Sequence, residues 1–231
     1  MRGGKWMIGM AALIWTFAPV GGLKSEGGVR GLAERFVQRL EAESGEAPVV
    51  RWNAESGTPE LLEGRLSKPS RHSPEWISYE FLERAKAAYG LKRVNESMKV
   101  ASVERSGSGA VTVAMERRLY GKPVCGDGLR IELDESGVVR RVEGTMHADL
   151  ERKRLHRPMI PAVSGKEAAE EAARYVRGDA SAAATARVRD CYLPEREGVP
   201  LVYIVSFGAG EGNAAGRTVI VHALTGRVID G

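Results

Sequence analysis

This 231-residue sequence lacks the short motifs that hold a catalytic metal, a phosphate group or a reactive serine. None of its four histidines opens an HExxH pattern, and no two lie four residues apart on a predicted helix, so we expect no zinc-peptidase site. There is no GxSxG elbow, and Gly210 and Gly212 do not have the spacing of a phosphate-binding loop. We therefore predict that the chain is not an enzyme and holds neither a metal nor a cofactor.

Cysteine is scarce as well. The two cysteines, Cys125 and Cys191, lie far apart, so there is no CxxC pair for zinc binding or redox work. In an oxidising compartment they could form one disulfide that joins the two halves of the chain. Two buried free thiols are the alternative, because the sequence gives no distance between them. Both readings stay open at this point.

Excess charge of one sign is small. The formal net charge is +4 at pH 7, and two of those charges belong to Arg2 and Lys5 at the N-terminus. So weak and scattered a charge does not indicate a nucleic-acid partner. The one dense basic stretch, residues 152–157, is interpreted as a solvated linker and not as a polyanion-binding signal.

The N-terminal residues follow the pattern of a secretory signal peptide. Arg2 and Lys5 precede an apolar run from Trp6 to Val20, and small residues follow it. The run is shorter than the about 20 apolar residues that span a bilayer. We predict a signal peptide over residues 1–22 and a secreted or cell-envelope location. An uncleaved membrane anchor is the alternative because no clean Ala-x-Ala cleavage site is present, and only in that case do we expect contact with a membrane.

The first half reads as helices followed by strands. Apolar residues at helical spacing predict a helix over residues 29–43, and Ser73-Pro74-Glu75 is typical of the start of a second helix that Gly90 closes. The segment 48–66 between them reads as extended chain and turns. Alternating apolar residues then predict four antiparallel strands, at 99–105, 111–115, 129–133 and 138–142.

The second half repeats this plan at a smaller size. Ser164 and Glu167 form a capping box that starts a helix with a face of small residues, ended by Gly178. Four strands are predicted after it, at 186–193, 201–207, 217–223 and 227–229. We therefore predict an α+β protein with two small domains, residues 23–145 and 163–231, joined by a linker at 146–162. Each domain is expected to be a helix packed on an antiparallel β-sheet, a cystatin-like layering.

Several short motifs follow one another along residues 50–230. Their residues are Trp52, Gly57, Pro59, Gly121, Pro123, Gly126, Gly137, Gly144, Thr225 and Gly226. In this order they resemble the propeptide of thermolysin-like metallopeptidases, a fungalysin/thermolysin-propeptide (FTP) module followed by a PepSY module. Whether these signature residues are structural or contact a partner is undecided.

The sequence also departs from that family. Arg117 stands where the family has Gln, Leu119 where it has Tyr, Cys125 where it has an aromatic residue, and His222 where it has Asp. The sequence ends at Gly231, where the family continues into its peptidase. If the departures at Arg117, Leu119 and Cys125 lie on the contact surface, they favour a protein-interaction module that binds no peptidase. If they lie in the core, they favour neither function.

The resemblance implies a binding function, because family propeptides template the folding of the peptidase and block its active cleft. We therefore expect an exported bacterial protein that inhibits a secreted thermolysin-like zinc metallopeptidase, assists its folding, or does both. The alternative is an envelope-associated or extracellular protein-interaction module with no peptidase partner. Residues 227–231 are interpreted either as the last edge strand or as a tail that occupies the peptidase cleft.

Overall fold

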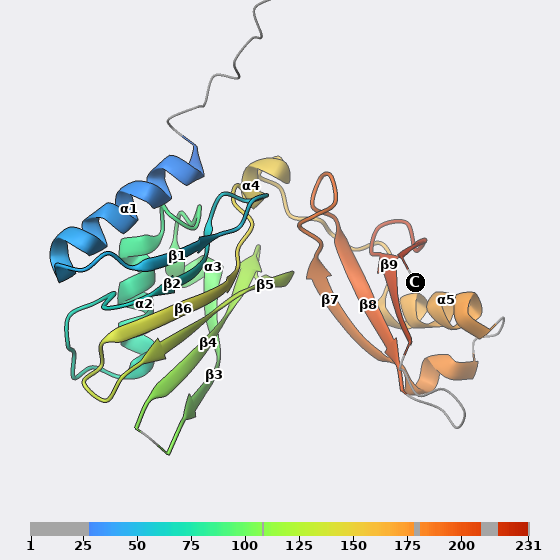
Figure 1. Cartoon of the computed structure of the whole chain (residues 1–231). Coiled ribbons are helices and arrows are strands. Elements are labelled where there is room, and N and C mark those ends of the chain that lie inside the picture. Colours follow the sequence, from blue (N-terminus) through green and yellow to red (C-terminus); the bar gives the residue numbers. More distant parts are fainter. Residues whose placement is uncertain (1–27, 108, 178–180, 209–216, 231) are drawn as a thin grey trace, which may run out of the picture.

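The computed structural model describes residues 28–107, 109–177, 181–208 and 217–230. The predicted signal peptide and Gly178 lie outside this described part. The described residues form a mixed α/β structure in which helices pack on a ten-stranded sheet (Figure 1). No helix among them is both long enough and apolar enough to cross a membrane.

The first half contributes six strands in the spatial order β1-β2-β6-β5-β4-β3, and all neighbours are antiparallel. Its elements are α1 (Val29–Ser44), β1 (Val49–Trp52), β2 (Pro59–Glu63), α2 (Pro74–Ala85), α3 (Val94–Ser97), β3 (Met98–Arg105), β4 (Val111–Leu119), β5 (Lys122–Leu133) and β6 (Val139–Thr145). The four predicted strands are confirmed as β3 to β6. The segment predicted only as extended chain adds two more, because β2 pairs with β6 and places Leu62 opposite Val142.

Local signals explain where the helices of this half begin and how they pack. The Ser73 hydroxyl accepts a hydrogen bond from the Trp76 amide and so caps α2, with Pro74 at its first position. Phe36 of α1 and Phe81 of α2 meet edge to face, with ring centroids 5.9 Å apart. Together they cover a core built with Met115 and Ile131 of the sheet.

The second half contributes four strands in the order β7-β8-β9-β10. Its elements are α4 (Leu150–Lys153), α5 (Gly165–Arg177), a 3-10 helix (Ser181–Thr185), β7 (Arg187–Tyr192), β8 (Leu201–Phe207), β9 (Arg217–His222) and β10 (Val228–Asp230). The capping box is confirmed: the Ser164 amide donates to the Glu167 carboxylate over 2.7 Å, and the Glu167 amide donates to the Ser164 hydroxyl. Residues 228–230 form the edge strand.

The stretch predicted as a linker is more structured than expected. It contains α4, and Met146 and Leu150 are fully buried at its start. Leu150 packs into the core of the second half together with Leu119 and Val124 of the first. The basic residues that follow are mostly exposed, as predicted, so the stretch is buried at its start and solvated beyond.

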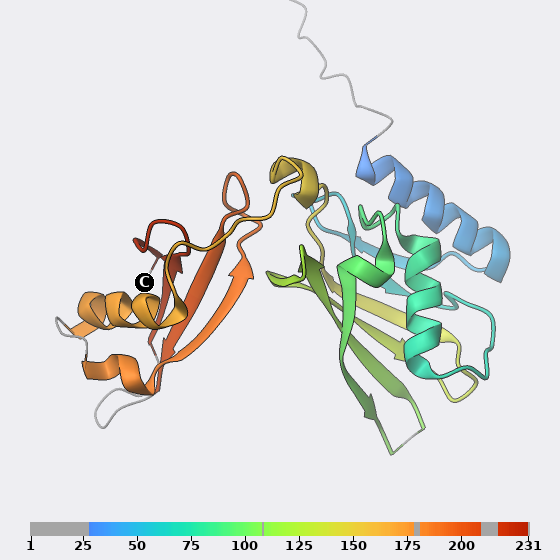
Figure 2. The same ribbon diagram turned by 180° about the vertical axis from the view of Figure 1, so that it is seen from behind.

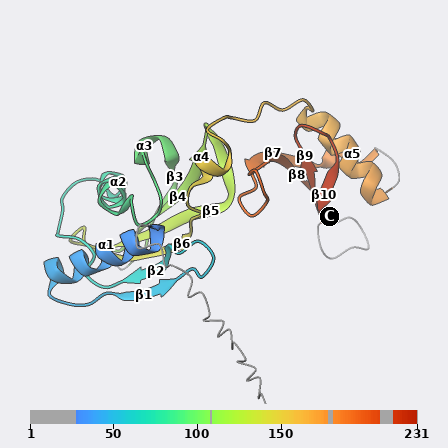
Figure 3. The same cartoon turned by 90° about the horizontal axis from the view of Figure 1, so that it is seen from above.

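The two halves of the sheet meet where β5 and β7 run parallel, with a single bridge between Val124 and Tyr192. In Figure 1 the strands lie in front of α2, α3 and α5. In Figure 2, which shows the molecule from behind, these three helices lie in front of the strands. Figure 3 likewise places α2, α3 and α5 on one side of the strands. The two halves therefore present helix-free faces on the same side of the molecule.

Candidate functional site

An open cavity of about 770 Å³ lies where the two halves of the sheet meet. Residues of β4, β5, β6 and β7 line it, with Arg51 and Glu60 of the first two strands at its rim. Met115 and Leu129 belong to the core under the helices, so their strand neighbours Glu116 and Arg130 point to the opposite face. The cavity therefore opens on the helix-free side.

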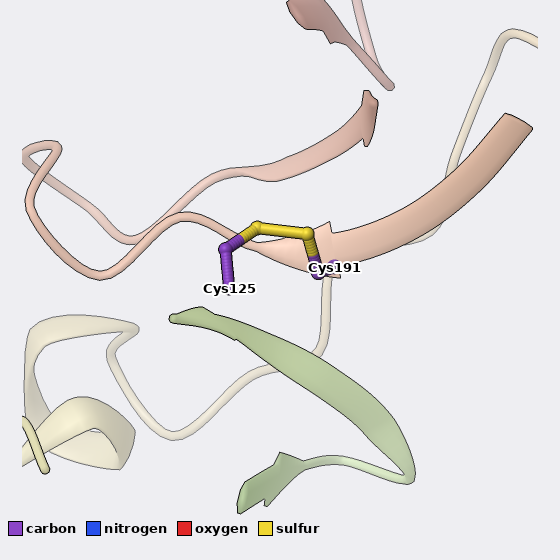
Figure 4. Close-up of a disulfide and its surroundings, with 2 residues drawn as sticks. All are labelled: Cys125 and Cys191. Carbon is purple, nitrogen blue, oxygen red and sulfur yellow. A yellow bond between two sulfur atoms is a disulfide. The ribbon is translucent and has the colours of Figure 1, made fainter. Parts of the chain in front are cut away.

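A disulfide between Cys125 and Cys191 forms part of the cavity wall (Figure 4). Their Cα atoms are 5.4 Å apart, although their sequence separation is 66. Of the two alternatives that the sequence left open, the structure contains the disulfide. Beside it, Lys122 forms an ion pair with Asp190, whose hydrogen bond raises the pKa of the lysine. These contacts cross-link the two halves next to the cavity.

Three charged or titratable side chains form a buried cluster that reaches the cavity at Asp127: Arg117, Asp127 and His147, which are 0%, 5% and 8% exposed. The Arg117 guanidinium donates to the His147 carbonyl over 3.1 Å. Asp127 accepts two hydrogen bonds from His147, 2.9 Å from the backbone amide and 2.6 Å from Nδ1 of the ring. These bonds connect β4, β5 and the chain after β6.

Burial and charge shift the pKa values in this cluster in opposite directions. Burial lowers the pKa of Arg117, against the attraction of Asp127 and Glu151. The hydrogen bond to Asp127 raises the pKa of His147, against the effect of burial. A histidine held this way serves to position the strands, because both of its bonds to Asp127 are used for structure. In the described part of the chain, no cluster of His, Cys, Asp and Glu side chains could hold a metal ion.

The cavity brings together only some of the predicted signature residues. Pro123, Gly126 and Gly144 line it together with the two cysteines. Trp52 lies under Arg30 of α1, with the guanidinium carbon 3.7 Å from the ring centroid. The remaining signature residues lie in turns or at strand ends and are not part of the cavity lining: Gly57, Pro59, Gly121, Gly137, Thr225 and Gly226.

Two signature glycines are required by close packing of the backbone. A Cβ at Gly137 would lie 2.1 Å from the Ser70 carbonyl oxygen, and one at Gly144 would lie 2.1 Å from that of Gly128. Both residues also have positive φ, 73° and 144°. The backbone by itself therefore accounts for glycine at these two positions.

The buried cluster was missed at the sequence level. The spacing of the histidines excluded a zinc-peptidase motif but gave no sign that His147 is buried against Asp127. A signal for Arg117 was present: the alternation Val113, Met115 continues to Arg117, an inward position in β4. The sequence offered no such signal for the partners of Arg117, because they come from distant parts of the chain: β5, the segment after β6, and α4.

Comparison with known proteins gives a weak similarity to a bacterial protease. No family model matches the chain. It is 27% identical over 106 residues to bacillolysin from Bacillus cereus, a match that covers 45% of this chain and 19% of bacillolysin. The chain is thus similar to a part that amounts to about a fifth of the length of that protein.

Proposed function

We propose that this chain is an exported binding protein that inhibits a secreted thermolysin-like zinc metallopeptidase, assists its folding, or does both, and that it is not itself an enzyme. The observation that carries the proposal is the similarity to bacillolysin, a thermolysin-like protease, over about a fifth of its length. This supports a relation to the propeptide region that the signature residues resemble.

The architecture gives this binding role a physical basis. Two halves of a sheet are held together by the Cys125–Cys191 disulfide and by a shared core at Leu119 and Val124. A surface that is rigid before binding loses little conformational entropy when a partner docks. If the same surface fits the peptidase near its folding transition state, it lowers that barrier, and if it stays bound it excludes substrate.

The finer architecture belongs to this proposal as well. We propose two cystatin-like domains, an FTP-like domain at residues 23–145 and a PepSY-like domain at 163–231, with the joining segment at 146–162. The packing of hydrophobic residues into one large cluster in each half supports this division. A secretory signal at residues 1–22 and a secreted or envelope location complete the proposal.

The departures from the family do not favour the alternative of an interaction module with no peptidase partner. Arg117 and Leu119 are buried, so these two changes lie in the core and not on a contact surface. Cys125 differs from the other two because it lines the cavity, but its side chain is bonded to Cys191. A change that creates a cross-link is explained by stability and requires no different partner.

The direct test uses the secreted, oxidised product of the full-length chain. We expect it, at micromolar concentration, to slow peptide hydrolysis by bacillolysin, to raise the yield of active bacillolysin on refolding, or both. The chain reduced, alkylated and unfolded is the matched control and should do neither. Bacillolysin whose activity and refolding are both unaffected would contradict the proposal. Bound zinc together with turnover of a substrate would contradict the non-enzyme part.

A further inference from the structure

Strand β7 has a free edge that opens on the cavity. All six of its residues pair with β8 on one side, from Arg187 opposite Ser206 to Tyr192 opposite Leu201. On its other side the bridge to β5 involves Tyr192 alone. Among the described residues, the backbone of residues 187–191 has no hydrogen-bonding partner on that side. An edge of this kind can accept a further strand.

The charges that line the cavity indicate which side chains the added strand should have. Most charged residues of the lining have an opposite charge bonded to them, in the pairs Arg51–Glu60, Glu116–Arg118, Glu143–Arg141, Asp127–His147 and Asp190–Lys122. Two arginines of the lining, Arg130 and Arg189, have no such ion pair within the described part of the chain, and both are exposed. The cavity therefore presents two guanidinium groups whose preferred partner is a carboxylate.

Both arginines lie on the helix-free side. Arg130 lies between Leu129 and Ile131 in β5, which belong to the core under the helices, so it points the other way. Arg189 is two residues before Cys191, which belongs to the small cluster away from α5 with Val202 and Ile204. One comes from each half of the sheet, and both line the cavity beside the edge of β7.

We propose that the free edge of β7 binds an extended segment of a partner protein with carboxylate side chains at alternate positions. The segment adds a strand to β7 through main-chain hydrogen bonds, and its acidic face meets Arg130 and Arg189. Alternate residues of a strand share one face, so the spacing of the acids follows from strand geometry. The inference rests on the proposed binding function and names the contact by which the partner is held.

The disulfide supplies a local readout of occupancy. Cys125 is partly exposed and lines the same cavity as both arginines. A strand seated on β7 covers the approach to the Cys125 and Cys191 sulfur atoms, so reduction by an external thiol, which requires direct attack on a sulfur, slows when the site is filled.

The test uses the oxidised full chain, labelled with ¹⁵N, and a short synthetic peptide in which threonine and glutamate alternate. We expect the peptide to shift the backbone amide resonances of residues 187–191 and to slow reduction of the disulfide, whereas a threonine-lysine peptide does neither. Arg130→Glu and Arg189→Glu should each weaken binding about tenfold, the loss expected for one charge-assisted contact. Arg105→Glu, an exposed strand arginine outside the cavity, is the matched control and should bind normally.

Several outcomes would overturn the inference: no binding at millimolar peptide, shifts confined to other strands, equal binding of the lysine peptide, or normal affinity in both folded variants. A dimer that the peptide disperses would also overturn it, because the occupant would then be a second copy of this chain. The proposed function is tested separately with bacillolysin. If the Arg130→Glu/Arg189→Glu double variant still acts on bacillolysin as the unmodified chain does, the edge site fails and the proposed function stands.

Discussion

Arg117 and His147 are joined by a hydrogen bond that ties β4 to the chain leaving β6, with 3.1 Å between the guanidinium Nη1 and the carbonyl oxygen. The arginine is fully buried, and its Nε and Nη2 atoms have no hydrogen-bond partner among the described residues. Its second neighbour along the strand, Leu119, packs into the core of the second half. The bond therefore lies at the boundary between the two cores, where loss of one partner affects both.

Replacement of Arg117 by Met should lower the free energy of unfolding by about 3 kcal/mol, because Asp127 and Glu151 lose a buried countercharge and the His147 carbonyl loses its donor. Urea denaturation followed by circular dichroism measures the loss. Arg39→Met, an exposed arginine of α1, is the matched control and should change stability little. Arg117→Gln, which restores a donor, should lose less than Arg117→Met. Equal stability of the Arg117→Met and Arg39→Met variants would show that the buried arginine contributes nothing.

The pair His147–Asp127 predicts a pH dependence of stability. The pKa of His147 is raised in the folded state above its ordinary value of 6.5, chiefly by the hydrogen bond to Asp127. A group of this kind stabilises the fold fully below its unfolded pKa, and the contribution is lost as the pH rises through the folded pKa. The free energy of unfolding should therefore fall as the pH rises from about 6.5 through the higher folded-state pKa of His147.

The comparison that isolates this effect is the pH profile of variants. In Asp127→Asn the fall should be smaller, because the charge that favours protonated His147 is gone. His72→Asn removes an exposed histidine and should leave the profile of the unmodified chain intact. If His72→Asn removed the pH dependence and Asp127→Asn preserved it, the pH dependence would not come from His147.

The disulfide should contribute substantially to stability because it closes a long loop. With a sequence separation of 66 between the cysteines, loss of chain entropy in the unfolded state corresponds to about 4 kcal/mol. The double variant Cys125→Ser/Cys191→Ser should unfold at a correspondingly lower urea concentration. Dithiothreitol should destabilise the unmodified chain by a similar amount and leave the double variant unchanged. If the reductant shifts both proteins equally, its effect does not come from this bond.

Gly137→Ala tests the close approach of the turn between β5 and β6 to Ser70. Gly45 and Gly137 have similar positive φ values, 78° and 73°, so alanine is strained by about 1–2 kcal/mol at either position. A Cβ at Gly45 has nothing within 4 Å, whereas at Gly137 it meets the Ser70 carbonyl oxygen at 2.1 Å. Gly137→Ala should thus cost about 1–3 kcal/mol more than Gly45→Ala. Thermal unfolding of the two variants measures the difference, and equal losses would exclude the steric contribution.

Local signals were sufficient where a structural element is decided by its own residues. The caps at Ser73 and Ser164 satisfy free amides of the same helix, so both helix starts were predictable. The alternation in β4 and β5 was readable because every second residue faces one core. The pairing of β2 with β6 was not, since it joins segments about 80 residues apart that carry no shared local pattern.

Some residues of the candidate site were also noticeable in the sequence, but their contacts were not. Gly144 and Pro123 stood out in the sequence, but nothing there placed them beside Cys191 or Arg189. Asp127 and His147 were not recognised as partners, because a buried ion pair depends on which side chains meet after strands have paired.

The sequence by itself determined the three longest helices (α1, α2 and α5), most of the strands and the absence of catalytic motifs, because each of these depends on neighbours within one turn of helix or a few residues of strand. Only the tertiary structure decided that the cysteines bond and that Arg117 is buried. It also decided that, in the described part of the chain, the free edge of β7 borders a cavity lined by two arginines without an ion pair. The physical reason is that these features depend on distances in space between residues far apart along the chain, and those distances exist only once the sheet has formed.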